Sequence, residues 1–153
     1  MRQLILDSNL LVLLLVGLKN PSLIKQHKRT RAYTVEDFDL LVSRLAGFDR
    51  ILVTPHVLAE CSNLLRQVRE PLCEQLTCCL KELIEGSGLD ETHVEARNAA
   101  AAAVFPRLGL TDSAILEIVS PDIPLLTVDV GLYVSALNTH GDCAVNFNHL
   151  RRF

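Results

Sequence analysis

The fold of this chain is decided by residues 3–18, QLILDSNLLVLLLVGL, where a short apolar run is followed almost at once by a longer one. Residues 3–6 are predicted to form a buried strand that ends at Asp7, and residues 10–18 a helix that is buried on nearly all sides. Asp7 and Asn9 argue against a signal peptide, and the run is shorter than the roughly 20 apolar residues that a transmembrane helix needs. The stretch therefore predicts a strand that leads into a core helix.

The rest of the chain continues this alternation of strand and helix. Further strands are predicted at residues 51–53, 125–128 and 143–147. Helices are predicted at residues 35–48, 55–69, 72–84, 90–104, 111–119 and 130–138. Because strands separated by helices favour a parallel sheet covered on both faces, we expect a three-layer α/β/α sandwich.

Length and composition predict one domain with a packed core. The chain has 153 residues, of which 49% are hydrophobic and 22% charged, a balance that excludes disorder. The net charge of −3 is not typical of a nucleic-acid binder, which often carries a strong basic excess. Any contact with nucleic acid must therefore be local.

The five cysteines do not suggest a disulfide framework. Their number is odd, and three of them, Cys73, Cys78 and Cys79, lie in a predicted helix. We therefore expect a reducing, cytoplasmic compartment. Neither these cysteines nor the scattered histidines have the spacing of a zinc site, so the cysteines are interpreted as packing residues and most histidines as surface residues.

Four acidic residues are candidates for a functional site. Asp7 and Asp129 end predicted strands, Asp112 opens a helix, and Glu60 lies about two turns into the helix after the second strand. In open parallel sheets, ligands bind beyond the carboxyl ends of the strands, so all four could meet at one edge. Each aspartate alone is also explained as a helix cap, and Glu60 as a solvated side chain.

Taken together, the four acids predict a metal site, because clustered carboxylates repel one another unless they share a cation. Hard oxygen ligands suit Mg²⁺ or Mn²⁺, whereas zinc prefers histidine and cysteine. The sequence offers no support for a thiol or Ser/His/Asp mechanism.

Four segments around these acids resemble the motifs of the PIN-domain family, in that family's usual order. They are LILDSNLLV at residues 4–12, TPHVLAECSNLL at 54–65, LGLTDSAIL at 108–116 and LLTVDVGL at 125–132, and the resemblance extends to the closing VNFNHL at 145–150. It implies a small α/β/α domain that cuts RNA with magnesium or manganese, often as a toxin held by an antitoxin and often as a homodimer. The chain departs from the family in a longer loop at residues 19–34 and in having no further acid just after Asp129.

The resemblance also implies roles for individual residues. Asp7, Asp112 and Asp129 would hold metal directly or through water, and Glu60 would hold metal or orient the attacking water. Three polar residues are expected to support the site by hydrogen bonds, or else to be local caps and exposed polar groups: Ser8, Asn63 and Thr127.

A basic stretch is the candidate RNA-binding segment. Its members are Lys25, Lys28, Arg29 and Arg31. They could steer an RNA backbone toward the acidic edge, although a solvated loop is the plainer interpretation.

Two other functions fit the same pattern. The chain could be a catalytically inactive interaction module with this fold. It could also be an aspartyl-phosphate phosphatase with Asp7 as the nucleophile, although Asn9 stands where a second aspartate would act as general acid. The presence of all four acids favours the nuclease.

Overall fold

The computed structural model describes residues 1–151, and its centre is one parallel sheet. Within this range the strands are β1 (Gln3–Leu6), β2 (Arg50–Val53), β3 (Leu89–Glu91), β4 (Leu125–Thr127) and β5 (Ala144–Asn146). Their order across the sheet is β3-β2-β1-β4-β5, and every neighbouring pair is parallel. All carboxyl ends therefore meet at one edge.

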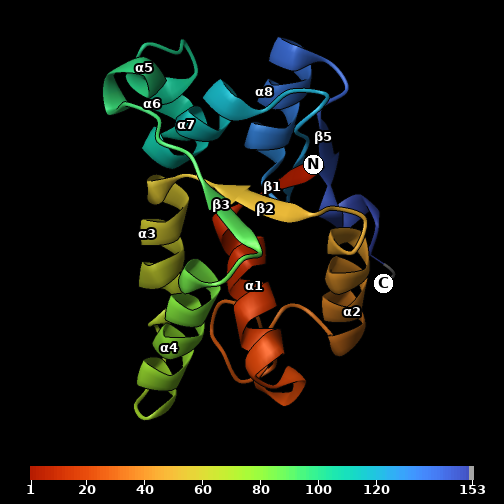
Figure 1. The fold of residues 1–153 in the computed structure, drawn as a ribbon, viewed down its shortest axis with the longest axis vertical. Coiled ribbons are helices and arrows are strands. Elements are labelled where there is room, and N and C mark those ends of the chain that lie inside the picture. Colours follow the sequence, from red (N-terminus) through yellow and green to blue (C-terminus); the bar gives the residue numbers. More distant parts are fainter. Residues whose placement is uncertain (152–153) are drawn as a thin grey trace.

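Helices cover the sheet on both sides, which confirms the three-layer α/β/α architecture. They are α1 (Ser8–Lys19), α2 (Val35–Leu45), α3 (Pro55–Leu65), α4 (Leu72–Glu85), α5 (Ala96–Ala100), α6 (Phe105–Leu108), α7 (Leu110–Ile118) and α8 (Val130–His140), with short 3₁₀ turns η1 (Pro21–Leu23) and η2 (Phe147–His149). Figure 1 shows α1–α4 on one side of the sheet and α5–α8 on the other.

Helix α1 is the central helix of the core, as its sequence predicts. Every residue from 10 to 17 is buried, and the helix packs against α2, α3 and α4. Asp7 caps its first turn by accepting a hydrogen bond from the Leu10 amide at 2.9 Å. No helix within residues 1–151 has the length and apolar character to cross a membrane.

The sequence prediction is wrong for residues 90–104. This stretch was expected to be one helix, but the structure has strand β3 at Leu89–Glu91 and only a short helix at Ala96–Ala100. Because β3 is an edge strand it can be polar, and Asp90 accepts hydrogen bonds from Gln3 at 2.8 Å and Arg50 at 3.0 Å. Pro106 lies in the first turn of α6 and does not end a helix.

Several helices begin or end at other residues than predicted. Helices α2 and α3 end at Leu45 and Leu65, earlier than expected, and α7 begins at Leu110. The N-cap of α7 is Gly109, whose φ of 84° favours glycine. Asp112 therefore lies in the first turn of α7 and is not its cap, contrary to the prediction.

Residues at the ends of the strands form a polar row across the carboxyl edge. Thr127 is aligned with Asn146, and the register of the other strands places Thr92, Thr54 and Asp7 in the same row. All of these except Thr92 are buried. The five strands thus end together in polar side chains, at the edge where Asp7 and Asp129 cap helices α1 and α8.

The close contact between α1 and α2 gives a test of the packing. A Cβ added to Gly17 would lie 2.2 Å from the Phe38 ring, so Gly17→Ala must displace a buried aromatic side chain. We expect this variant to unfold at lower urea, with a loss of about 1–3 kcal/mol. Helix propensity alone predicts a gain of about 1 kcal/mol instead.

The matched control is Gly88→Ala, since a Cβ there meets no atom within 4 Å. A Gly17→Ala protein as stable as the wild type would mean that α1 and α2 are not packed as described.

Candidate active site

Asp7 lies at the centre of the candidate site and is 4% exposed. Besides Leu10, its carboxylate accepts hydrogen bonds from the hydroxyl of Thr127 and from the amide of Val128, the latter at 2.9 Å. Burial raises the pKa of Asp7, and these hydrogen bonds oppose that effect only in part. Asp7 is thus a buried carboxylate that joins the start of α1 to the end of β4.

Thr127 connects Asp7 to Asp129. Its hydroxyl donates to Asp7 and accepts a hydrogen bond from the Asp129 amide at 2.9 Å. Asp129 caps α8 by accepting from the Leu132 amide at 2.8 Å, and its side chain is otherwise exposed. A Cβ at Gly131 would approach the Asp129 carboxylate to 3.3 Å, so this turn leaves little room for a larger residue.

Asp112 is the most perturbed of the exposed or half-buried acids. Burial is the largest cause that raises its pKa to about 7, and the negative charges of Asp129, Asp7 and Glu60 add to it. No hydrogen bond within residues 1–151 satisfies its carboxylate. Asp112 is therefore a half-buried carboxyl group that nothing in the described range neutralises.

Glu60 completes the group from the middle of α3, where it is half-buried. Its charge reaches Asp112 and also helps to raise the pKa of the neighbouring Cys61 thiol to about 12, for which burial is the main cause. The structure thus brings the other three acids within electrostatic range of Asp112. Among residues 1–151, however, no three His, Cys, Asp or Glu side chains already form a metal-binding group.

The three supporting residues behave differently. Thr127 makes the expected hydrogen bond to Asp7. Ser8 is buried beside Asp7, but its hydroxyl has no hydrogen-bond partner. Asn63 is exposed, and nothing in the described range links it by a hydrogen bond to the acids.

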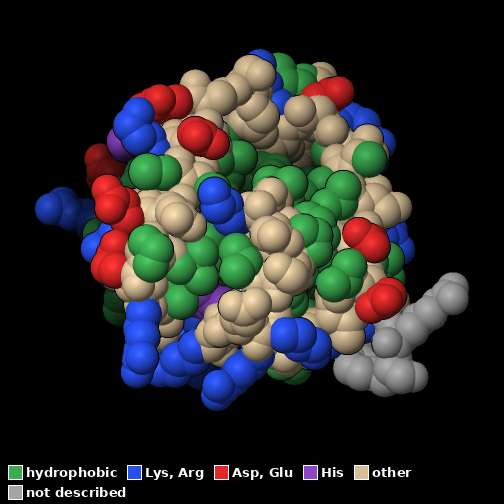
Figure 2. Space-filling model, turned by 90° about the horizontal axis from the view of Figure 1, so that it is seen from below, with side chains coloured by type: hydrophobic (Ala, Val, Ile, Leu, Met, Phe, Trp, Pro, Cys, Tyr) green, Lys and Arg blue, Asp and Glu red, His purple; other side chains and the backbone are tan. Residues whose placement is uncertain are grey.

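The basic segment lies away from the acids. It follows the far end of α1, whose 12 residues span about 18 Å, and all four basic side chains are exposed. Figure 2 looks at this end of the molecule and shows Lys and Arg side chains gathered along one edge of the face, with acids on its flanks. The segment is not simply a solvated loop, because His27 and Thr30 within it are fully buried.

The chain returns toward the acids just after the basic segment, at Tyr33. Burial raises the pKa of Tyr33 to about 12, and the charge of Asp7 adds to this, so the two groups lie within electrostatic range. The Arg151 guanidinium lies 4.6 Å from the Tyr33 ring centre and bonds to Asp37 at 2.9 Å. Tyr33 is thereby held between the C-terminal segment and α2.

Sequence reasoning missed four polar residues near the acids. They are Thr54 and Asn146 in the polar row, Ser113 after Asp112, and His56 in the first turn of α3. Thr54 also caps α3, by accepting from the Val57 amide at 3.1 Å. Strand alignment could have revealed Thr54 and Asn146, but the buried, unpartnered atoms of Ser113 and His56 are visible only in three dimensions.

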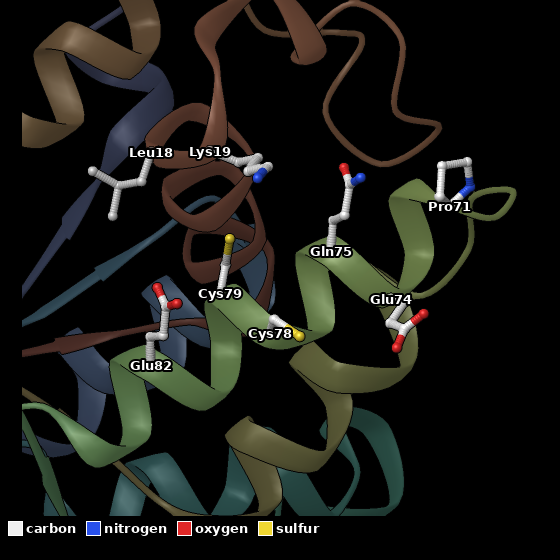
Figure 3. Close-up of a pocket in the computed structure, with 8 residues that line it drawn as sticks. All are labelled: Leu18, Lys19, Pro71, Glu74, Gln75, Cys78, Cys79 and Glu82. Atoms are coloured by element: carbon white, nitrogen blue, oxygen red, sulfur yellow. The ribbon is translucent and has the colours of Figure 1, made fainter.

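A hollow with a volume of about 470 Å³ lies away from the acids, between the end of α1 and α4. Lys19, two glutamates and the thiols of Cys78 and Cys79 line it, and the two sulfur atoms point in different directions (Figure 3). None of the four candidate acids contributes to its wall. Cys78 is exposed, so the interpretation of Cys73, Cys78 and Cys79 as packing residues is wrong for Cys78.

Comparison of the sequence with models of known protein families, and with curated proteins, gave no match. The geometry and chemistry of this edge of the sheet are therefore the structural basis for assigning a function.

The raised pKa of Asp112 predicts how stability depends on pH. The folded protein holds this proton more tightly than the unfolded chain, so without metal the free energy of unfolding contributed by Asp112 falls as pH rises from 3.8 to about 7. Asp112→Asn removes this titration. In urea unfolding with EDTA, the free energy of unfolding of the variant should rise relative to that of the wild type as the pH increases from 3.8 to about 7. Above pH 7 the variant should be the more stable protein.

Glu117→Gln, an exposed acid on the same helix, serves as the control and should follow the wild type at each pH. A difference between Asp112→Asn and wild type that does not change with pH would show that Asp112 is not electrostatically coupled to the other acids.

Proposed function

We propose that this protein is a metal-dependent endoribonuclease that hydrolyses RNA phosphodiester bonds at the site formed by Asp7, Glu60, Asp112 and Asp129. The observation that carries the proposal is the gathering of Asp7, Asp129 and Glu60 within electrostatic range of half-buried Asp112 at the carboxyl edge of the sheet, and burial and these charges together raise the pKa of Asp112. Strongly perturbed acids grouped at the carboxyl edge of a parallel sheet favour a functional site over isolated helix caps.

The donor set supports Mg²⁺ or Mn²⁺ as the cofactor. All four side chains offer hard oxygen atoms, and within the described range none of these acids takes part in a salt bridge that would neutralise it. A carboxylate has about four acceptor positions. Asp7 uses three of them in the hydrogen bonds described above, which leaves a position for a cation.

Each of the four acids would have its own role in binding the metal ion or the attacking water. A bound divalent ion lowers the pKa of water and offsets negative charge on the scissile phosphate. Asp7 would act as the fixed ligand, because its buried hydrogen bonds prevent it from moving. Asp112 would release its proton when the ion binds, and Asp129 and Glu60 lie at the more open side, where an ion or a water can be oriented.

RNA as the substrate is supported by the resemblance to PIN domains and by the basic segment. The acids alone repel a polyanion, so affinity must come from cations and from remote basic groups. Lys25, Lys28, Arg29 and Arg31 are exposed and would hold the RNA backbone about one helix length from the acids. The same resemblance extends the proposal to a cytoplasmic toxin with an antitoxin partner, and to a homodimer.

The geometry of Asp7 makes the phosphatase alternative less favourable. A nucleophilic carboxylate needs an open line of approach, whereas Asp7 is buried and both of its oxygen atoms accept hydrogen bonds. The other alternative, a catalytically inactive interaction module with the same fold, is distinguished from the nuclease only by a measurement of RNA cleavage.

The proposal predicts cleavage of single-stranded RNA with Mg²⁺ or Mn²⁺ and its loss in EDTA. Asp112→Asn and Asp129→Asn should each lower kcat/KM at least about a hundredfold. Mutation of residues that only hydrogen-bond to metal ligands already lowers activity by about ten- to a hundredfold, and a ligand itself should matter more. Asparagine at 129 can still accept the capping hydrogen bond of Leu132, so this variant removes charge and not the helix cap.

Asp142→Asn, an exposed acid away from the site, is the matched control and should retain full activity. Cleavage that persists in EDTA, or that survives both site variants, would rule out the proposed mechanism.

A further inference from the structure

Two of the histidines have ring nitrogens bound to the protein, and His56 does not. Nε2 of His27 lies 2.9 Å from the Leu65 carbonyl oxygen, and Nε2 of His140 lies 2.9 Å from that of Leu116. His56 forms no such bond with any residue of the 1–151 range, although its Nδ1 is buried. Its ring is therefore not part of the protein's own hydrogen-bond network.

His56 stands at the same edge as the acids. It follows Thr54 by two residues, and Thr54 is aligned with Asp7 on the adjacent strand, roughly 4.8 Å away in a sheet. His56 and Glu60 are four residues apart on α3, so they share one face of the helix with Cβ atoms roughly 5–6 Å apart. The imidazole thus lies beside the carboxylate group and outside the set of candidate ligands.

Two buried hydroxyl groups of the described range also have no hydrogen-bond partner. They belong to Ser8 and Ser113, which are the sequence neighbours of Asp7 and Asp112. Native proteins rarely leave a buried polar atom without a hydrogen-bond partner, because that arrangement is unfavourable. Nδ1 of His56 is such an atom at this edge of the sheet, and no residue of the 1–151 range supplies its partner.

The substrate of the proposed function is an anion that approaches an anionic site. In the described residues no lysine or arginine forms an ion pair with the four acids. A histidine beside Glu60 supplies a hydrogen-bond donor for a phosphate without adding a permanent charge that would compete with a metal ion.

We propose that His56 is a further catalytic residue, whose imidazole donates a hydrogen bond through Nε2 to the scissile phosphate of the RNA. This rests on the nuclease function proposed above. The hydrogen bond fixes the phosphate against the face of α3 that carries Glu60 and stabilises the charge that builds on it during hydrolysis.

The test compares His56→Ala, His56→Gln and His56→Asn in metal-dependent RNA cleavage. His56→Ala should lower kcat/KM about ten- to a hundredfold, the usual effect of a lost hydrogen bond to a charged group. A glutamine amide reaches the place of Nε2, and an asparagine amide that of Nδ1. His56→Gln should therefore keep more activity than His56→Asn, whereas a structural role of the buried Nδ1 predicts the reverse order.

Two further measurements separate this role from metal binding and from folding. The rise in melting temperature on adding Mn²⁺ should be the same in His56→Ala as in wild type, because His56 is not a ligand. In an Asp129→Asn background, in which cleavage is expected to be strongly reduced, adding His56→Ala should weaken RNA binding further. His93→Ala, at an exposed histidine after β3, is the matched control and should change neither quantity.

The outcomes distinguish the two proposals. Wild-type protein without metal-dependent cleavage overturns both of them. An active wild type with a fully active His56→Ala, or with His56→Asn more active than His56→Gln, overturns only the role of His56. A Mn²⁺ response lost in His56→Ala would make it a metal ligand and would also contradict the role proposed here.

Discussion

The hydrogen bonds to the buried carboxylate of Asp7 are the interaction on which the rest of the site depends. They come from the first turn of α1 and from the end of β4, so one side chain joins the start of the central helix to a neighbouring strand. An ionised carboxylate in the interior is costly unless it is well paired, and this one is paired with neutral donors only. Thr127 extends the connection to Asp129, which fixes two of the four acids relative to each other.

The surrounding core explains why such an arrangement persists. Helix α1 is apolar over residues 10–17 and buried on all sides, so it cannot shift to let water reach Asp7. Burying the Asp7 carboxylate at the first turn is unfavourable, and the packing of the whole helix offsets this. The carboxylate is thereby held rigidly at the edge of the sheet. Proteins commonly give up local stability at a functional site in this way.

The sequence predicts the parallel sheet and the approximate place of every acid, because both follow from local patterns. A strand that ends in Asp7, and another that ends just before Asp129, can be recognised from a few residues each. Strand β3 could not be recognised, since an edge strand made of Leu89, Asp90 and Glu91 has no apolar pattern and is held by its neighbours.

Contacts between distant segments could not be predicted either, because they depend on the whole fold and leave no local pattern in the sequence. The first turn of α7 suggested a cap at Asp112, but its surroundings are set by three acids from other helices and strands. Tyr33 lies within electrostatic range of Asp7 and is contacted by Arg151, near the other end of the chain. Nδ1 of His56 is buried without a hydrogen-bond partner, and only the three-dimensional structure shows this.

The proposed cleavage of RNA requires this acidic protein to attract a polyanion at one place and to bind cations at another. Here the exposed basic segment and the carboxylates are at opposite ends of α1, so the field that would attract a polyanion does not neutralise the acids. The acids are then free to bind cations, which is the central claim of this account.

A crystal structure of the protein grown with Mn²⁺, with anomalous scattering measured at the manganese edge, tests that claim most directly. The account predicts an anomalous peak among Asp7, Asp112 and Asp129, with oxygen atoms at about 2.0–2.4 Å. A well-ordered structure at neutral pH with millimolar Mn²⁺ and no peak at these acids, or with manganese bound only elsewhere, would contradict it.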